Sequence, residues 1–156
     1  MRLIKVVIIS CCLFCVNVIA QPLQAFSTDI LLKQQQENKG KRWLILLWSV
    51  DCPPCYKELA LVSELRKQYD LLPIIIINTD DNDEVSKERI NVIKQFKLDD
   101  LLNLYFIDGQ GAYNRYSIDP SWHGELPRSY FIDEQGKARG RSGLINKELL
   151  LTWLKK

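Results

Sequence analysis

Two uninterrupted apolar runs dominate the hydrophobic pattern of the chain, at residues 43–47 and 74–77. Neither run alternates with polar positions, so we predict two strands, at 42–48 and 71–78, that are buried on both faces of a sheet. The stretch between them, 56–69, has the pattern of an amphipathic helix. A strand, a helix and a second strand in this order predict a βαβ unit, with parallel strands and a right-handed crossover.

The remaining pattern predicts that the chain folds as one α/β domain. A third strand and a β-hairpin complete a mixed sheet of four to five strands, flanked by helices. Ser27 or Thr28 is expected to cap the first helix, and Asn146 the last. Residues 21–26 are expected to form an extended lead-in. The further predicted elements are helices at 29–38, 84–97, 112–116 and 147–156, a strand at 102–107, and hairpin strands at 128–133 and 137–141.

The first twenty residues have the pattern of a secretory signal peptide. Two basic residues near Met1 precede an uncharged, mostly apolar stretch at 6–20, which ends in the small-residue pattern of a cleavage site at Ala20. About 15 apolar residues are short for a membrane span, which needs roughly 20; an uncleaved membrane anchor is the alternative. We therefore expect a domain at 21–156 that acts in the periplasm or another extracytoplasmic space.

Removal of residues 1–20 changes both the charge and the cysteine content. The whole chain has 21 Lys and Arg residues against 19 Asp and Glu, and the loss of Arg2 and Lys5 leaves 19 against 19. A neutral domain gives no electrostatic reason to expect a nucleic-acid partner. Three of the five cysteines are also lost, so the domain keeps only Cys52 and Cys55.

Cys52 and Cys55 form the most informative motif, Cys-Pro-Pro-Cys, between a buried strand and a helix. Cys52 is expected at the N-terminus of the helix, where free N–H groups and the helix dipole stabilise a thiolate. Cys55 lies one turn further on, within reach for a disulfide but less exposed. Pro53 suits the first turn, where its missing N–H has no partner to lose. We infer that Cys52 is the attacking nucleophile and Cys55 the resolving thiol.

Other uses of the two cysteines have weaker support in the sequence. A disulfide between positions three apart closes too short a loop to staple a small secreted domain. A metal site needs further ligands, and His123 is the only histidine. The acidic segment 79–83 lacks the glycine and the distal glutamate of a calcium loop, so a strand-to-helix loop is expected there. The pair is therefore predicted to be redox-active, without a metal or another cofactor.

Four local features point to a known family. Trp48 stands four residues before the first cysteine, the Cys-Pro-Pro-Cys motif follows, and Glu58 lies three residues after the second cysteine. The fourth feature is the segment 125–136, which reads Glu-Leu-Pro-Arg-Ser-Tyr-Phe-Ile-Asp-Glu-Gln-Gly. With these features, residues 21–156 resemble the thioredoxin superfamily, in particular its extracytoplasmic branch of the TlpA and ResA type. The resemblance implies a thioredoxin-like fold.

The resemblance also implies roles for individual residues. Glu58 matches a glutamate that tunes the active-site thiols and is the expected acid–base group for Cys55; a solvated glutamate on the helix face is the alternative. The match at Pro127 implies a cis peptide bond after Leu126, beside the cysteines, with a trans proline on an edge strand as the alternative. The backbone of Leu126 would then offer free hydrogen-bonding groups to an extended substrate segment. With Trp48, these two residues are the predicted substrate-binding positions.

The chain departs from the family pattern at four positions and in one segment. Asp51 replaces the usual tryptophan before Cys52, and its carboxylate is expected to raise the pKa of that thiol unless the side chain points to solvent. A longer segment before Pro127 places Trp122 and His123 near the predicted site. In one alternative, Trp122 contacts a substrate and His123 shuttles protons. In the other, Trp122 covers the edge of the core and His123 is an exposed loop residue. The other replacements are Leu46 for a buried aspartate, Ala60 for a proline after the glutamate, and Arg128 for a threonine.

Together these features predict an extracytoplasmic thiol–disulfide oxidoreductase that works through a mixed disulfide at Cys52, resolved by Cys55. We favour a monomeric disulfide reductase that acts on secreted or periplasmic proteins such as apocytochrome c and receives electrons from a membrane thiol transporter. A disulfide-donating oxidase or isomerase uses the same atoms and is the runner-up. Two other classes stay open: a binding module or chaperone with a static disulfide, and a Cu(I) metallochaperone, which the single His and single Met argue against.

Overall fold

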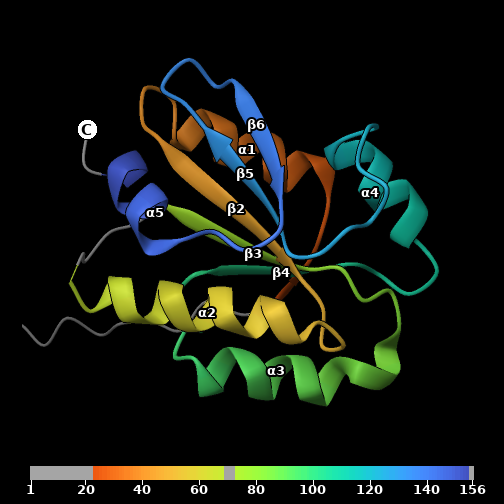
Figure 1. Cartoon of the computed structure of the whole chain (residues 1–156). Coiled ribbons are helices and arrows are strands. Elements are labelled where there is room, and N and C mark those ends of the chain that lie inside the picture. The colour runs from red at the N-terminus through yellow and green to blue at the C-terminus, as the bar shows by residue number, and fades with distance from the viewer. Residues whose placement is uncertain (1–22, 69–72, 155–156) are drawn as a thin grey trace, which may run out of the picture.

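A six-stranded sheet runs through the middle of the structure, a computed structural model that describes residues 23–68 and 73–154 (Figure 1). The strand order is β1-β4-β3-β2-β5-β6. The first four strands in this order are parallel, and β5 and β6 are added antiparallel. The predicted mixed sheet, βαβ unit and hairpin are thereby confirmed. The strands are β1 Gln24–Ala25, β2 Trp43–Trp48, β3 Ile74–Asn78, β4 Leu102–Tyr105, β5 Arg128–Ile132 and β6 Ala138–Ser142.

The sheet has six strands where four to five are predicted, because the lead-in at its start is itself a strand. β1 pairs in parallel with β4, with Gln24 opposite Leu104. The Phe26 N–H continues this pairing by donating to the Tyr105 carbonyl at 2.7 Å. A strand of two residues shows no hydrophobic period, so the sequence pattern does not distinguish it from a loop.

In the described part of the chain, five α-helices and one short 3-10 helix, η1, accompany the sheet. α2, α3 and α5 supply apolar side chains to the core on one face, and α1 and α4 pack against the core on the other. Ser27 and Asn146 cap the first and last helices as predicted, accepting hydrogen bonds from the N–H groups of Ile30 at 3.3 Å and Leu149 at 2.7 Å. The helices are α1 Thr28–Glu37, α2 Pro53–Arg66, η1 Asp83–Val85, α3 Ser86–Gln95, α4 Gly111–Ile118 and α5 Lys147–Leu154.

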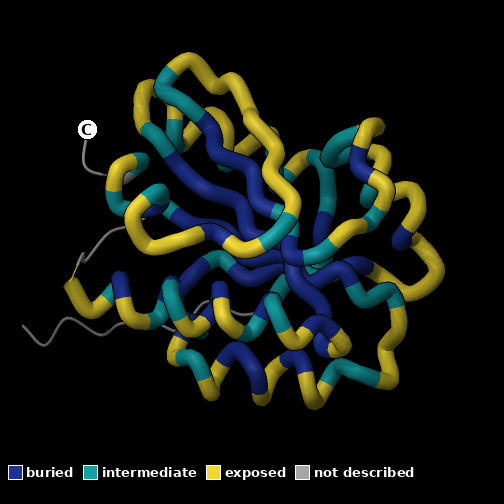
Figure 2. The backbone as a smooth tube through the Cα atoms, viewed as in Figure 1, coloured by how far each residue is buried: buried dark blue, intermediate teal, exposed yellow. Residues whose placement is uncertain are grey.

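The two central strands are buried on both faces, as their unbroken apolar runs predict. Every residue of β2 and β3 is buried (Figure 2). Successive side chains of a strand point to opposite faces, so Leu44 and Leu46 join the cluster under α2 and α3, while Ile45 and Leu47 join the cluster on the side of α1. The carboxyl end of β2 is therefore held firmly between two cores.

The predicted signal peptide at 1–20 lies outside the described residues. Within 23–68 and 73–154, no helix combines the length and the apolar content that crossing a membrane requires. α2 begins at Pro53, three residues before the predicted start of this helix, because Cys52 is its N-cap residue. This end of α2 carries the candidate site.

Candidate active site

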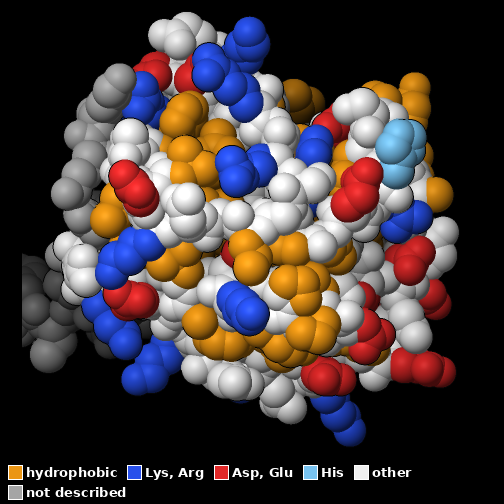
Figure 3. Space-filling model, viewed as in Figure 1, with side chains coloured by type: hydrophobic (Ala, Val, Ile, Leu, Met, Phe, Trp, Pro, Cys, Tyr) orange, Lys and Arg blue, Asp and Glu red, His pale blue; other side chains and the backbone are white. Residues whose placement is uncertain are grey.

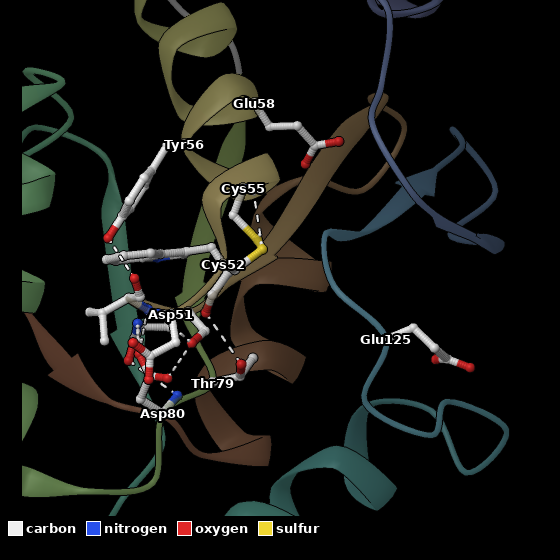
Figure 4. Close-up of a disulfide and its surroundings, with 12 residues drawn as sticks. Asp51, Cys52, Cys55, Tyr56, Glu58, Thr79, Asp80 and Glu125 are labelled. Carbon is white, nitrogen blue, oxygen red and sulfur yellow. Dashed lines mark hydrogen bonds between the residues drawn. A yellow bond between two sulfur atoms is a disulfide. The ribbon is translucent and has the colours of Figure 1, made fainter.

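The Cys-Pro-Pro-Cys motif lies where β2 leads into α2, and its two cysteines form a disulfide (Figure 4). The S–S distance is 1.95 Å, and the two Cα atoms are 5.3 Å apart. Cys52 is the N-cap residue of α2, and the two prolines occupy the first positions of the helix. The structure thus confirms that Cys52 stands at a helix N-terminus.

A backbone N–H group points at the Cys52 sulfur. Prolines have no N–H, so the first N–H of α2 belongs to Cys55. It donates to the Cys52 carbonyl at 2.9 Å and to the Cys52 sulfur at 3.2 Å. In the reduced protein, this N–H and the positive end of the helix dipole would stabilise a thiolate on Cys52.

Exposure distinguishes the two sulfur-bearing residues. Cys52 is 7% exposed and Cys55 is 1% exposed. Cys52 is therefore the more accessible residue of the two, which is consistent with the order of attack inferred from the motif. In the view of Figure 3, hydrophobic side chains gather over the N-terminal part of α2 and surround the side chain of one basic residue.

A carboxylate from the neighbouring strand holds the loop that leads into Cys52. Asp80 follows β3, and its carboxylate accepts hydrogen bonds from the Val50 N–H at 2.9 Å and from the Ser49 hydroxyl (Figure 4). It accepts a third from the side-chain amide of Asn78 at 2.8 Å. β2 and β3 are paired in parallel, with Trp48 opposite Asn78, so the ends of the two strands bring the loop and this carboxylate together.

A buried arginine holds the segment that carries Asp80. Arg89 of α3 donates from Nε to the Asn78 side-chain oxygen at 2.7 Å and from Nη2 to the Asp80 carbonyl at 3.1 Å. Its guanidinium carbon also lies 4.8 Å from the ring centroid of Tyr105 on β4. Hydrogen bonds therefore connect α3, the end of β3 and the cysteine loop in series.

Sequence reasoning missed this network. A sequence feature that could have indicated it is the set of polar residues directly after β3. The carboxyl ends of neighbouring parallel strands meet at one edge of a sheet, and α/β proteins place their functional sites at this edge. The described residues contain no group of three or more His, Cys, Asp or Glu side chains placed to hold a metal ion. Within the acidic segment 79–83, Asp81 accepts a hydrogen bond from the Gly111 N–H at 3.1 Å, at the start of α4.

Replacing Asp80 by alanine is expected to destabilise the folded protein by about 1–3 kcal/mol, because the Val50 N–H and the Ser49 hydroxyl lose their acceptor in a partly buried site. Urea unfolding of the oxidised variant measures this change. The control is Asp108→Ala, which removes an exposed carboxylate after β4 and is expected to stay within about 0.5 kcal/mol of wild type. Equal effects of the two substitutions would show that Asp80 does not support the loop.

Glu58 is buried one turn after Cys55, which excludes the alternative of a solvated glutamate. The residue is 4% exposed. Its Oε1 accepts a hydrogen bond from the Ile145 N–H at 2.7 Å, and the side chain points toward the segment between β6 and α5 (Figure 4). Burial raises the pKa of this carboxyl to about 7, and the Ile145 hydrogen bond and Arg141 oppose the rise only in part. The carboxyl can therefore exchange a proton near neutral pH, while its acid–base role toward Cys55 stays a prediction.

The Leu126–Pro127 peptide bond is cis, as the resemblance implies. Pro127 is buried, and its carbonyl accepts a hydrogen bond from the Gly143 N–H at 2.9 Å. Leu126 is partly buried and packs against both core clusters, one of which contains both cysteines. Among the described residues, no hydrogen bond to the N–H or the C=O of Leu126 is present. The N–H and C=O groups of Leu126 are therefore free to pair with a ligand.

Two other predicted site residues differ in their access to solvent. Trp48 is 2% exposed and packs in the same core cluster as the cysteines, so its side chain supports the site from inside and a substrate does not reach it. Asp51 is exposed, and its N–H donates to the Ser49 hydroxyl oxygen at 3.1 Å. Of the two predicted alternatives for Asp51, the one in which its side chain points to solvent describes the structure.

The segment before Leu126 is fixed by a tryptophan. Trp122 is buried in the core cluster on the α1 side, and its Nε1 donates to the Glu125 carbonyl at 3.0 Å. His123 is exposed. Of the two predicted alternatives for these residues, the core-edge tryptophan and the exposed histidine describe the structure.

A parallel βαβ unit, an antiparallel hairpin and a Cys-x-x-Cys disulfide at a helix N-terminus define the thioredoxin-like class.

No family model matches the chain. It is 34% identical over 125 residues to the thiol–disulfide oxidoreductase ResA of Bacillus thuringiensis subsp. konkukian, covering 78% of this chain and 66% of ResA. It is 29% identical over 105 residues to the thioredoxin-like protein YneN of Bacillus subtilis, covering 65% of this chain and 55% of YneN. The fold is also similar to that of a secreted Mycobacterium tuberculosis disulfide oxidoreductase homologous to E. coli DsbE, with a TM-score of 0.58, 16% identity, and coverage of 77% of this chain and 84% of that one.

The chain belongs to the thioredoxin superfamily, and its sequence is ResA-like. It spans only 55% to 66% of the length of these curated relatives. Membership and fold therefore follow from the comparisons, whereas the activity, substrates and partners of this chain are argued from its own site.

Proposed function

We propose that this chain is a thiol–disulfide oxidoreductase that reduces disulfides in extracytoplasmic proteins. The observation that carries the proposal is the Cys52–Cys55 disulfide at the start of α2, in which the more exposed cysteine caps a helix and the other is enclosed. This is the environment in which a cysteine thiolate becomes reactive. The name of the related ResA protein, a thiol–disulfide oxidoreductase, supports the same chemistry here.

The proposed reaction begins from the dithiol form. The Cys52 thiolate attacks one sulfur of a substrate disulfide, which forms a mixed disulfide and releases the other substrate sulfur as a thiolate. Cys55 then loses its proton and attacks the Cys52 sulfur, which releases the second substrate thiolate and closes the Cys52–Cys55 disulfide. The substrate gains two electrons and its thiolates take up protons. Glu58, with a pKa of about 7, is the proposed acceptor of the Cys55 proton.

Two surfaces near the pair suit a protein substrate. The N–H and C=O groups of Leu126 are free to pair with an extended segment as an added strand. The hydrophobic side chains over the N-terminal part of α2 offer an apolar contact at the end of the helix that carries the cysteines (Figure 3). Both features support substrates that are proteins rather than small disulfides.

The proposed location is outside the cytoplasm. The signal-peptide pattern at 1–20 supports it, and the similar M. tuberculosis protein is described as secreted. In an oxidising compartment a reductase must be supplied with electrons, so the proposed partner is a membrane thiol transporter. The proposed protein substrates include apocytochrome c, and the protein is proposed to act as a monomer.

The proposal is tested by the reduction of insulin with dithiothreitol, followed by precipitation of the freed B chain. The oxidised wild-type protein is expected to accelerate precipitation over dithiothreitol alone, because its pair passes electrons to the insulin disulfides. A binding module whose disulfide is static gives no acceleration, and this result would refute the proposed function.

A further inference from the structure

Arg128 directly follows Pro127, where the family pattern has threonine, and its side chain is largely buried. The side chain is 14% exposed and lies across the partner strand β6 at Gly140. A Cβ atom at Gly140 would stand 2.1 Å from Arg128 Nη2, so only glycine leaves room for the guanidinium there. The register places Gly140 opposite Tyr130.

The guanidinium joins three elements. Its Nη2 donates to Asp119 Oδ2 at 2.9 Å, at the end of α4, and its Nη1 donates to Ser142 Oγ at 3.0 Å, at the end of β6. The guanidinium carbon of Arg128 also lies 4.9 Å from the ring centroid of Tyr130 on β5. The Tyr130 hydroxyl donates to the same Asp119 oxygen at 3.0 Å. Arginine, aspartate and tyrosine therefore form a closed ring of contacts.

Asp119 and Arg128 stand at the two ends of the loop that carries the Leu126 backbone. Inside this loop, the Trp122 N–H donates to the Asp119 carbonyl at 3.0 Å, and the indole N–H donates to the Glu125 carbonyl at 3.0 Å. The ion pair closes the loop at its base, and the indole, buried in the core on the α1 side, ties the loop to that core through the Glu125 carbonyl. The conformation at Leu126 thus depends on contacts made at the loop ends.

We propose that Arg128 is a positioning residue, which holds the loop so that the free N–H and C=O groups of Leu126 can pair with an extended segment of a protein substrate. This inference rests on the proposed exchange function. Arg128 donates to Asp119 and Ser142 and lies over Tyr130, and none of these contacts involves a cysteine. Its loss therefore weakens binding of a substrate that lies along the loop and spares a small disulfide that needs only Cys52.

The test compares the steady-state reduction of insulin and of glutathione disulfide by wild type and Arg128→Leu, with dithiothreitol as the electron donor. The KM for insulin is expected to rise about tenfold with kcat unchanged, and kcat/KM for glutathione disulfide to stay within about twofold. Gly140→Ala keeps the arginine but displaces its guanidinium, so it is expected to reproduce the rise. Arg139→Ala is the matched control, because it removes an exposed positive charge from the same hairpin and is expected to leave both values unchanged.

Three results would overturn the proposal. The first is an unchanged KM for insulin in a folded Arg128→Leu protein, and the second is an equal rise in Arg139→Ala, which would make charge the cause. The third is a parallel loss with glutathione disulfide, which would place the effect on the cysteines. If Arg128→Leu does not fold, Gly140→Ala and Asp119→Asn provide the same readout. A wild-type protein that reduces neither substrate refutes the proposed function instead.

Discussion

Replacement of Cys52 by serine is expected to abolish catalysed insulin reduction, a loss of about 10³-fold or more. The attacking sulfur is gone, and Cys55 is too enclosed to take its place. Cys55→Ser is expected to lose turnover as well but to keep the first step, so that a mixed disulfide with the substrate accumulates at Cys52. Mass spectrometry of the reduced variants, quenched with acid after incubation with insulin, detects this adduct.

The two serine variants are matched controls, because each removes one sulfur from the same disulfide. With Cys52 as the attacking residue, the adduct forms in Cys55→Ser and is absent in Cys52→Ser. Equal adducts in both variants, or activity retained by Cys52→Ser, would contradict the assigned roles. A binding module with a static disulfide would retain its partner after either change and would form no adduct.

Glu58→Gln is expected to make the oxidised protein more stable than wild type above neutral pH and to leave its stability nearly unchanged in acid. Folding raises the pKa of the carboxyl from its ordinary value of 4.5 to about 7, because burial disfavours the charge. The folded state therefore binds this proton more tightly than the unfolded state. Wild type loses about 3 kcal/mol of stability as the pH rises through the interval between these two values. Glutamine does not ionise, and its amide oxygen can still accept the Ile145 hydrogen bond.

Urea unfolding of both oxidised proteins from about pH 4 to about pH 9 measures this difference, and the disulfide keeps the cysteines from titrating. Glu64→Gln is the control on the same helix. Glu64 is exposed and pairs with Lys147 at 2.6 Å, which lowers the pKa of its carboxyl. Its replacement is therefore expected to bring no gain above neutral pH. A stability difference between Glu58→Gln and wild type that is constant across the pH range would contradict the raised pKa of Glu58.

The strands that place the cysteines could be predicted because their side chains follow a simple pattern. β2 and β3 are unbroken apolar runs, and the structure buries every one of their residues. The position of Cys52 at a helix N-terminus followed from the same pattern, since a strand ends just before it and an amphipathic stretch begins just after. β1 escaped prediction because its two residues join the sheet through backbone pairing, which leaves no mark on the side-chain pattern.

The individual contacts that support the site could not be predicted, because they form across long stretches of chain. Asp80 and Ser49 are 31 positions apart and come together through the register of β2 and β3. Glu58 and Ile145 are 87 positions apart, so the sequence around Glu58 does not reveal that its carboxylate is buried. For Trp48, the predicted role in substrate binding conflicts with the prediction that residues 42–48 form a strand buried on both faces, and the structure buries this side chain in the core.

The reduction potential of the Cys52–Cys55 pair, measured by equilibration with dithiothreitol or glutathione buffers, tests the proposed reductase most directly. A reductase requires a pair that holds its disulfide strongly once electrons have been passed on, as in thioredoxin at about −270 mV. We therefore expect a potential of about −250 mV or lower. A value of about −120 to −180 mV would mean that the pair gives its disulfide away, which would contradict a reductase and favour a disulfide donor that uses the same two sulfur atoms.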